Sequence, residues 1–149
     1  MANYFFDTSA LAKHDHVENG TPEVERILNE SGSTHYISRL ATVEIQSVFA
    51  LKARTQEITL QDLQQLQKHI AADFAAMCFP VIRMLQSHFQ DAERLIRKHG
   101  PARSLRTLDS LQLAVALSLN SQGKLDYFVC ADAKLGKVAA DEGLSVINP

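Results

Sequence analysis

Tyr4-Phe5-Phe6-Asp7-Thr8-Ser9-Ala10-Leu11 is an aromatic run that ends in an acid and continues into small and apolar residues. Three aromatic residues with no charge among them are typical of a strand that is buried on both faces of a sheet. Ala10-Leu11-Ala12 then begins a helical pattern. Asp7 is therefore predicted at the carboxyl end of a strand, the edge of an α/β sheet where ligands bind. Because aspartate also caps a following helix well, this stretch alone leaves both roles open.

The composition is that of an ordinary globular protein. The chain has 149 residues, 46% of them hydrophobic and 21% charged, so we expect one domain over residues 1–149. The net charge of −2 gives no overall basic signature, so nucleic-acid binding would depend on a local patch. Cys78 and Cys130 lack metal-type spacing and are expected to be reduced thiols in a cytoplasmic protein. No signal peptide or membrane-spanning run is predicted.

Strand-like and helix-like segments alternate along the chain. Strands are predicted at 4–6, 35–38, 79–85, 126–130 and 144–147. Helices are predicted at 10–13, 21–31, 39–54, 60–77, 87–98, 108–119 and 133–141. This alternation predicts a parallel sheet with helices on both faces.

Several helix starts carry capping signals, and one helix carries a clear apolar pattern. Ser38 and Thr107 are predicted to cap helices, and Thr59–Asp62 and Ser87–Gln90 are predicted to form capping boxes. For the helix at 39–54, helical spacing predicts a buried face. That face contains Leu40, Val43, Ile45, Val48, Phe49 and Leu51.

Four acidic side chains are predicted to meet at the carboxyl edge of the sheet. Asp7 and Asp132 follow strand ends, Asp109 lies in the first turn of an apolar helix, and Glu44 lies among apolar residues of another helix. Each has a structural explanation alone, as a cap or an outward-pointing residue. Together, without a basic residue at helical spacing, they indicate a site for Mg²⁺ or Mn²⁺. The sequence 14–16, His-Asp-His, is interpreted instead as an exposed helix end.

The order and spacing of these motifs resemble those of PIN-domain ribonucleases, in particular VapC-type toxins of toxin–antitoxin pairs, over essentially the whole chain. Phe6–Leu11 with Lys13 matches the opening motif of the family. Glu44 in Thr-Val-Glu-Ile, Asp109 in Leu-Asp-Ser-Leu-Gln-Leu-Ala and Asp132 in Cys-Ala-Asp-Ala-Lys-Leu match its other three acids.

This resemblance implies a three-layer α/β/α sandwich with a five-stranded parallel sheet in the order 3-2-1-4-5. It implies a metal-dependent endoribonuclease, a hydrolase that leaves 5′-phosphate and 3′-hydroxyl ends. Asp7, Glu44, Asp109 and Asp132 would be the catalytic residues and would hold Mg²⁺ or Mn²⁺. The expected partners are the RNA substrate, a cognate antitoxin protein and a second copy of the chain in a homodimer.

Residues beside the acids have expected supporting roles. Thr8 and Ser9 are expected to orient Asp7. The family often has threonine or serine two residues before the last acid, where this chain has Cys130. Because a thiol is a poorer hydrogen-bond partner than a hydroxyl, this departure puts one supporting contact in doubt and leaves Asp132 itself unaffected.

Three basic residues are candidates for binding the RNA backbone. Arg103 and Arg106 lie in the loop before the helix of Asp109, and Lys13 is a weaker candidate. A purely solvated role for the two arginines stays open. So does an alternative function, a non-catalytic PIN-like module that binds protein or RNA and keeps the acids as a structural cluster. Metal-dependent cleavage would separate the two functions.

Overall fold

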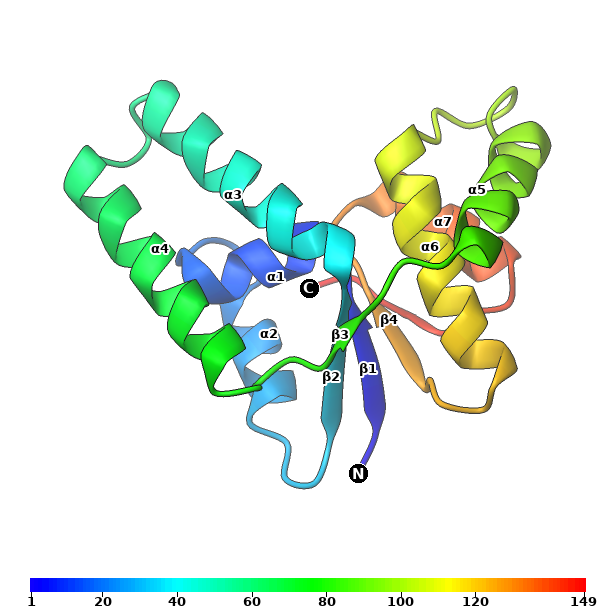
Figure 1. The fold of residues 1–149 in the computed structure, drawn as a ribbon, viewed down its shortest axis with the longest axis horizontal. Helices are drawn as coiled ribbons and strands as arrows, with labels where there is room; N and C mark the ends of the chain where they lie inside the picture. Colours follow the sequence, from blue (N-terminus) through cyan, green and yellow to red (C-terminus); the bar gives the residue numbers. More distant parts are fainter.

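A computed structural model describes residues 1–149 as a five-stranded parallel sheet between two layers of helices (Figure 1). The strands are β1 (Asn3–Phe6), β2 (Thr34–Ser38), β3 (Val81–Ile82), β4 (Tyr127–Val129) and β5 (Val146–Ile147). The helices are α1 (Thr8–Asp15), α2 (Thr21–Leu28), α3 (Arg39–Arg54), α4 (Leu60–Ala75), α5 (Gln86–His99), α6 (Thr107–Ser121) and α7 (Ala133–Asp141). The strand order is β3-β2-β1-β4-β5 and all neighbours are parallel. The predicted α/β/α sandwich and its strand order are confirmed.

The central strand β1 supplies side chains to two separate hydrophobic cores. Tyr4 and Phe6 pack with residues of α1 to α4, whereas Phe5 packs on the other face with Phe128 and residues of α5 to α7. Phe5 and Phe6 are fully buried, so the predicted burial on both faces is confirmed. Full burial of one such ring contributes roughly 1.5–3 kcal/mol. These rings fix β1, and with it the position of Asp7 at its end.

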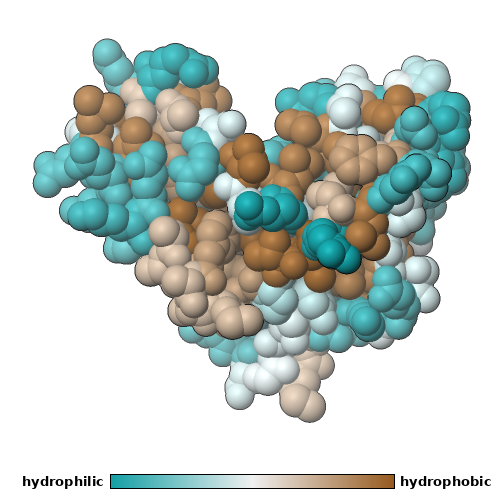
Figure 2. Space-filling model, in the orientation of Figure 1, coloured by the Kyte–Doolittle hydropathy of each residue, from teal (hydrophilic) through white to brown (hydrophobic).

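The helices are divided between two sides of the molecule. Helices α3 and α4 form one arm, α5 and α6 form the other, and the carboxyl ends of the central strands lie between them (Figure 1). The space-filling view shows a hollow between the two arms, bordered by both apolar and polar side chains (Figure 2). No helix is long and apolar enough to cross a lipid bilayer.

The helix starts agree only in part with the capping predictions. Ser38 caps α3 by accepting a hydrogen bond from the backbone of Ala41, and Thr59–Asp62 forms the predicted capping box of α4. The predicted box Ser87–Gln90 is wrong, because α5 begins at Gln86. There the ring of His88 accepts a hydrogen bond from the backbone N–H of Leu85 at 3.0 Å. An imidazole nitrogen thus performs the role expected of glutamine.

The buried face of α3 agrees with the predicted one only in part, because Ile45 and Phe49 are buried as predicted and Val43 and Leu51 are not. Val43 and Leu51 are 62% and 48% exposed, whereas Ala41, Ile45 and Phe49 are fully buried. The buried residues recur every four positions and face the sheet, α1 and α4. The alternative stripe has the same spacing, so periodicity alone does not show which of the two is covered. Apolar side chains, Val43 and Leu51 among them, therefore lie on the outside of this arm.

Glu142 joins α5 to the end of α7, the helix that begins beside Asp132. Its side chain is 6% exposed and lies 2.6 Å from the guanidinium of Arg94, 2.7 Å from the ammonium of Lys98 and 3.3 Å from the ring of His99. Burial alone would raise the pKa of this carboxyl. Hydrogen bonds from Lys98, Arg94 and His99 outweigh burial and lower the pKa to about 2.

Replacing Glu142→Gln is expected to lower the free energy of unfolding by about 2 kcal/mol at pH 7, because three cations lose their buried partner. Since the native pKa lies below the ordinary 4.5, the stabilisation is complete above about 4.5 and is lost as the pH falls towards about 2. Urea unfolding at pH 7 and pH 3 measures this difference, with the exposed Glu93→Gln of α5 as the control. If the free energies of unfolding of wild type and Glu142→Gln differ by the same amount at pH 7 and pH 3, the stabilising role of the ionised Glu142 carboxylate is contradicted.

Candidate functional site

The four predicted acids line one cavity at the carboxyl edge of the sheet. Asp7 follows β1, Glu44 comes from α3, Asp109 from the first turn of α6, and Asp132 follows β4. The cavity has a volume of about 160 Å³. Its other lining residues are Thr8, Ser9, Val48, Arg106 and Gln112. The structure thus brings the four side chains together, and their role in catalysis stays a prediction.

Asp7 is both a helix cap and part of the acid group. Its Oδ1 accepts hydrogen bonds from the backbone N–H of Ala10 at 3.1 Å and from the hydroxyl of Ser9 at 2.5 Å. Its side chain is almost completely buried, with 5% of the residue exposed. Burial raises the pKa of Asp7 to about 6, the hydrogen bonds oppose this rise, and the charge of Asp109 adds to it. The capping role therefore coexists with a carboxylate that is costly to ionise.

Ser9 and Cys130 connect the ends of the two central strands. The Ser9 hydroxyl donates to Asp7 and accepts from the backbone N–H of Ala131 at 3.0 Å. The Cys130 sulfur lies 3.6 Å from Asp7 Oδ2 and 3.3 Å from the carbonyl of Asp132. Burial raises the pKa of the thiol, so its single proton stays in place and serves one acceptor at a time. The supporting contact that the sequence analysis put in doubt is therefore present, as a weaker hydrogen bond from the Cys130 thiol.

Gln112 of α6 is the site residue that the sequence analysis missed. Its amide donates to the hydroxyl of Thr8 and to Oε1 of Glu44, both at 2.9 Å, and accepts from the hydroxyl of Ser38 at 2.7 Å. Thr8 also donates to Glu44 at 3.2 Å, so it orients this acid rather than Asp7, contrary to expectation. The signal was available, because a glutamine in an apolar helix and three residues after Asp109 lies on the same face.

Asp109 and Asp132 have different partners. Helix α6 begins at Thr107, one residue earlier than predicted, so the prediction that Thr107 caps the helix is wrong, and Arg106 lies just before it. The Arg106 guanidinium is 3.2 Å from Asp109 Oδ2, three residues along the chain, so the expectation that no basic residue lies at helical spacing from the acids is wrong for Asp109. Burial raises the pKa of Asp109, Arg106 opposes this rise, and the charge of Asp132 adds to it. Asp132 caps α7 by accepting from the backbone N–H groups of Lys134 and Leu135. One arginine therefore faces four acids.

The four acids line the cavity, but their carboxylate oxygens do not converge on a single point. No three of them bring carboxylate oxygens within 4.8 Å of one another, a distance at which only His14, Asp15 and Asp73 form such a group. An ion in the cavity would therefore keep water ligands, as Mg²⁺ commonly does. Helix α1 does end at Asp15, as predicted, but His14 and Asp15 are partly buried, so the predicted exposure of this helix end is wrong.

Only one of the three candidate RNA-binding residues lies at the acids. Arg106 lines their cavity. Arg103 pairs with Asp141 at 2.7 Å and lines a separate cavity together with two lysines of α7. Lys13 donates to the carbonyl of Asn19 and lines a neighbouring cavity of about 500 Å³, which borders Asp132. Arg103 and Lys13 therefore lie beside the acid cavity and do not line it.

Replacing Asp7→Asn is expected to stabilise the metal-free protein above pH 7. The native pKa of about 6 lies above the ordinary 3.8, so ionisation costs native stability as the pH rises through 6, on the order of 2–3 kcal/mol. Asparagine keeps the cap. In EDTA, the melting temperature of Asp7→Asn should therefore be higher than that of wild type at pH 8 and close to it at pH 4. The exposed Glu93→Gln of α5 is the control, and equal melting temperatures for wild type and Asp7→Asn at pH 8 would leave Asp7 as a cap only.

Replacing Gln112→Leu is expected to destabilise the protein by about 2–3 kcal/mol, because the Ser38 hydroxyl loses its acceptor and Glu44 loses a donor in a buried place. Urea unfolding measures this change. The matched control is Gln67→Leu on the exposed face of α4, where no buried hydrogen bond is lost. A variant as stable as wild type would show that the Gln112 amide does not organise the acids.

Several solved structures match almost the entire chain. No protein-family model and no curated protein matches the sequence. VapC20 from Mycobacterium tuberculosis, a sarcin-ricin loop cleaving toxin, has a TM-score of 0.69 at 16% identity, covering 98% of this chain and 99% of its own. VapBC2 from Rickettsia felis, bound to a promoter DNA fragment, has 0.68 at 15%, covering 99% and 98%. FitAcB from Neisseria gonorrhoeae has 0.67 at 15%, covering 98% and 97%. Identities this low establish the fold alone, and the chain has the PIN-like α/β/α fold of these toxin–antitoxin proteins.

Proposed function

We propose that the protein is a metal-dependent endoribonuclease and the toxin of a toxin–antitoxin pair. The observation that carries this proposal is the cavity where Asp7, Glu44, Asp109 and Asp132 meet with Arg106 as the one basic lining residue. A purely structural acid cluster would be expected to have a matching set of cations, because unpaired buried carboxylates are costly.

The donor set of the cavity fits a hard divalent cation. All four acids offer carboxylate oxygens, and no histidine lines the cavity. Oxygen ligands of this kind suit Mg²⁺ and Mn²⁺. Asp7, Glu44 and Asp109 would hold the ion, and Asp132 would assist or hold its waters. A bound ion of this type lowers the pKa of a water and offsets the charge that builds up on a phosphate.

The neighbouring side chains would keep the acids in place for this chemistry. Ser9 fixes one oxygen of Asp7, and Thr8 and Gln112 both fix Oε1 of Glu44. Arg106 is 77% exposed in its side chain and carries its charge at the edge of the cavity. A guanidinium in this place suits a phosphate oxygen of the RNA backbone.

The choice of RNA as substrate rests on the comparisons. VapC20 shares the fold and is described as cleaving the sarcin-ricin loop, which is an RNA. The overall charge of −2 means that affinity for RNA would come from local basic groups such as Arg106 and Arg103. We therefore propose RNA as the substrate and leave both the RNA and the cleaved sequence open.

The proposal predicts a defined pair of ends on the cleaved RNA. Attack by water from outside the chain leaves a 5′-phosphate and a 3′-hydroxyl, in the presence of Mg²⁺ or Mn²⁺ only. Glu44→Gln should lower the rate at least ~100-fold without unfolding the protein, whereas Glu93→Gln on α5 should match wild type. End-labelled RNA with ligation-based mapping reads the ends. Cyclic 2′,3′-phosphate products, or full activity in EDTA, would exclude this mechanism. RNA binding without cleavage would favour the non-catalytic alternative.

The proposal also includes an assembly. We propose a homodimer in which the cognate antitoxin covers the acid cavity of each chain. Exposed apolar residues such as Val43 and Leu51 of α3 are available for such contacts. Light scattering should give twice the 16.5 kDa of one chain, and expression without antitoxin should arrest growth unless Glu44→Gln is present. A monomer would contradict the dimer, and harmless expression of active protein would contradict the toxin assignment.

A further inference from the structure

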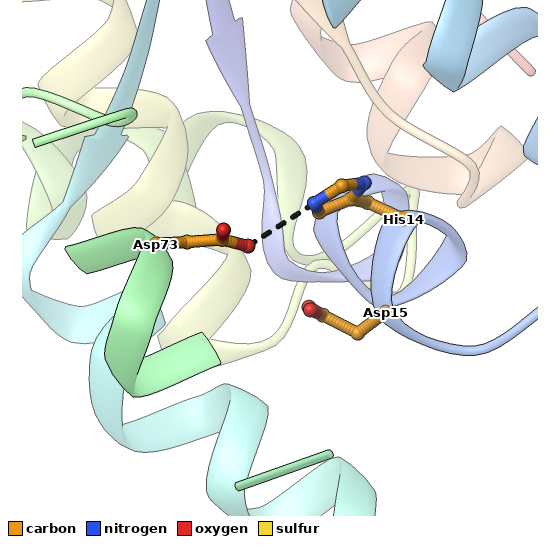
Figure 3. A group of neighbouring side chains, drawn as sticks. All are labelled: His14, Asp15 and Asp73. Carbon is orange, nitrogen blue, oxygen red and sulfur yellow. Dashed lines mark hydrogen bonds and ion pairs between the residues drawn. The ribbon is translucent and has the colours of Figure 1, made fainter. Parts of the chain in front are cut away.

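Helices α1 and α2, which are consecutive, and the more distant α4 bring one histidine and three carboxylates together. His14, near the end of α1, has Nδ1 at 2.6 Å from Glu25 Oε1 of α2 and Nε2 at 3.1 Å from Asp73 Oδ2 of α4. Asp15 follows His14, and Figure 3 shows its carboxylate extending into the space between α1 and α4. Ligand atoms of His14, Asp15 and Asp73 all lie within 4.8 Å of one another.

A second feature of this group is a buried oxygen without a partner. Asp15 Oδ2 is the only buried side-chain nitrogen or oxygen in the protein that makes no hydrogen bond. No lysine or arginine forms an ion pair with Asp15, Glu25 or Asp73. Native proteins leave few such atoms unpaired, and an ion is one of the partners that explains them.

The charges of the group do not balance by themselves. With the imidazole of His14 protonated and all three carboxylates ionised, the net charge of the group would be −2. Only His14 forms ion pairs with Glu25 and Asp73. A divalent cation would cancel this charge and supply a partner for Asp15 Oδ2.

We propose that this group is a site for Zn²⁺ or a similar transition-metal ion, separate from the acid cavity. His14 Nε2, Asp15 and Asp73 are the ligands, since an imidazole with carboxylates suits zinc and not Mg²⁺. Glu25 accepts the hydrogen bond from Nδ1–H and so fixes the tautomer that presents Nε2 to the ion. Binding releases the proton that Nε2 now shares with Asp73.

The site would hold α4 against the helix that begins at the acid cavity. Asp7 caps one end of α1 and Asp15 ends it, and eight helical residues span roughly 12 Å. The ion is therefore too far from Asp7 to take part in phosphate chemistry. It joins the last turn of α4 to α1 and α2, where His14 also packs edge-on against Phe79.

The test is the binding of zinc to the whole chain. Titration calorimetry with Zn²⁺ alone and metal analysis after dialysis measure stoichiometry and affinity, and Co²⁺ in its place reports the coordination geometry by its visible spectrum. His14→Gln and Asp73→Asn each remove one ligand. His69→Gln, an exposed histidine of α4, and Glu44→Gln in the acid cavity are the matched controls.

One Zn²⁺ per chain is expected, with affinity lowered on the order of 100-fold in His14→Gln and Asp73→Asn and unchanged in both controls. Glu25→Gln should weaken binding by a smaller factor, about 10-fold, because it only orients the ligand. Zinc should also raise the melting temperature of wild type and not of Asp73→Asn.

Three results would overturn the proposal: no zinc bound, affinity unchanged in both ligand variants, or affinity lost in Glu44→Gln. The first or second would leave His14 as a hydrogen-bonded link between helices, and the third would assign zinc to the acid cavity. RNA cleavage with Mg²⁺ is measured separately. Its failure would reject the proposed function and leave the zinc result standing.

Discussion

The buried carboxylate of Asp7 is the constraint on which the site depends. The aromatic side chains of β1 fill both cores, so the strand that carries Asp7 cannot shift without opening one of them. The hydrogen bonds from Ser9 and Ala10 then fix the carboxylate itself. Because the remaining acids approach from α3, α6 and the end of β4, the sheet and both helical layers determine the geometry of one small cavity.

The cavity keeps its acids close while limiting the cost of doing so. Two carboxylates about 5 Å apart repel by roughly 3 kcal/mol at an effective dielectric constant of 20. Burial raises the pKa of Asp7 and of Asp109, which relieves part of this repulsion through protonation, and Arg106 relieves another part. Gln112 acts differently, since its amide links Glu44, Thr8 and Ser38 without adding charge. What remains is an excess of negative charge that a divalent cation would neutralise.

The sequence predicted well the features that depend on local patterns of residues. The aromatic run at β1 and the acids after two strands identified the sheet, its carboxyl edge, Asp7 and Asp132, whereas Glu44 and Asp109 were identified as isolated acids in apolar helices. The missed features depend on which residues meet across the fold. The two apolar stripes of α3 have the same spacing, and only the packing of α1 and α4 determines which stripe is buried. His14 and Asp73 are 59 residues apart, so their contact is not visible in a local pattern. The expectation that both Thr8 and Ser9 orient Asp7 failed at Thr8 for the same reason, because the sequence does not show that the helix directs the Thr8 hydroxyl towards Glu44 and the Ser9 hydroxyl towards Asp7.

The central claim is that Asp7 is an uncompensated buried carboxylate whose ionisation a divalent cation favours. Carbon-13 NMR of the side-chain carboxyl groups measures its titration directly, with Asp7→Asn identifying the signal. Without metal, Asp7 should titrate near pH 6, and in saturating Mg²⁺ its midpoint should fall well below that value. A midpoint near the ordinary 3.8, unchanged by Mg²⁺, would contradict the account.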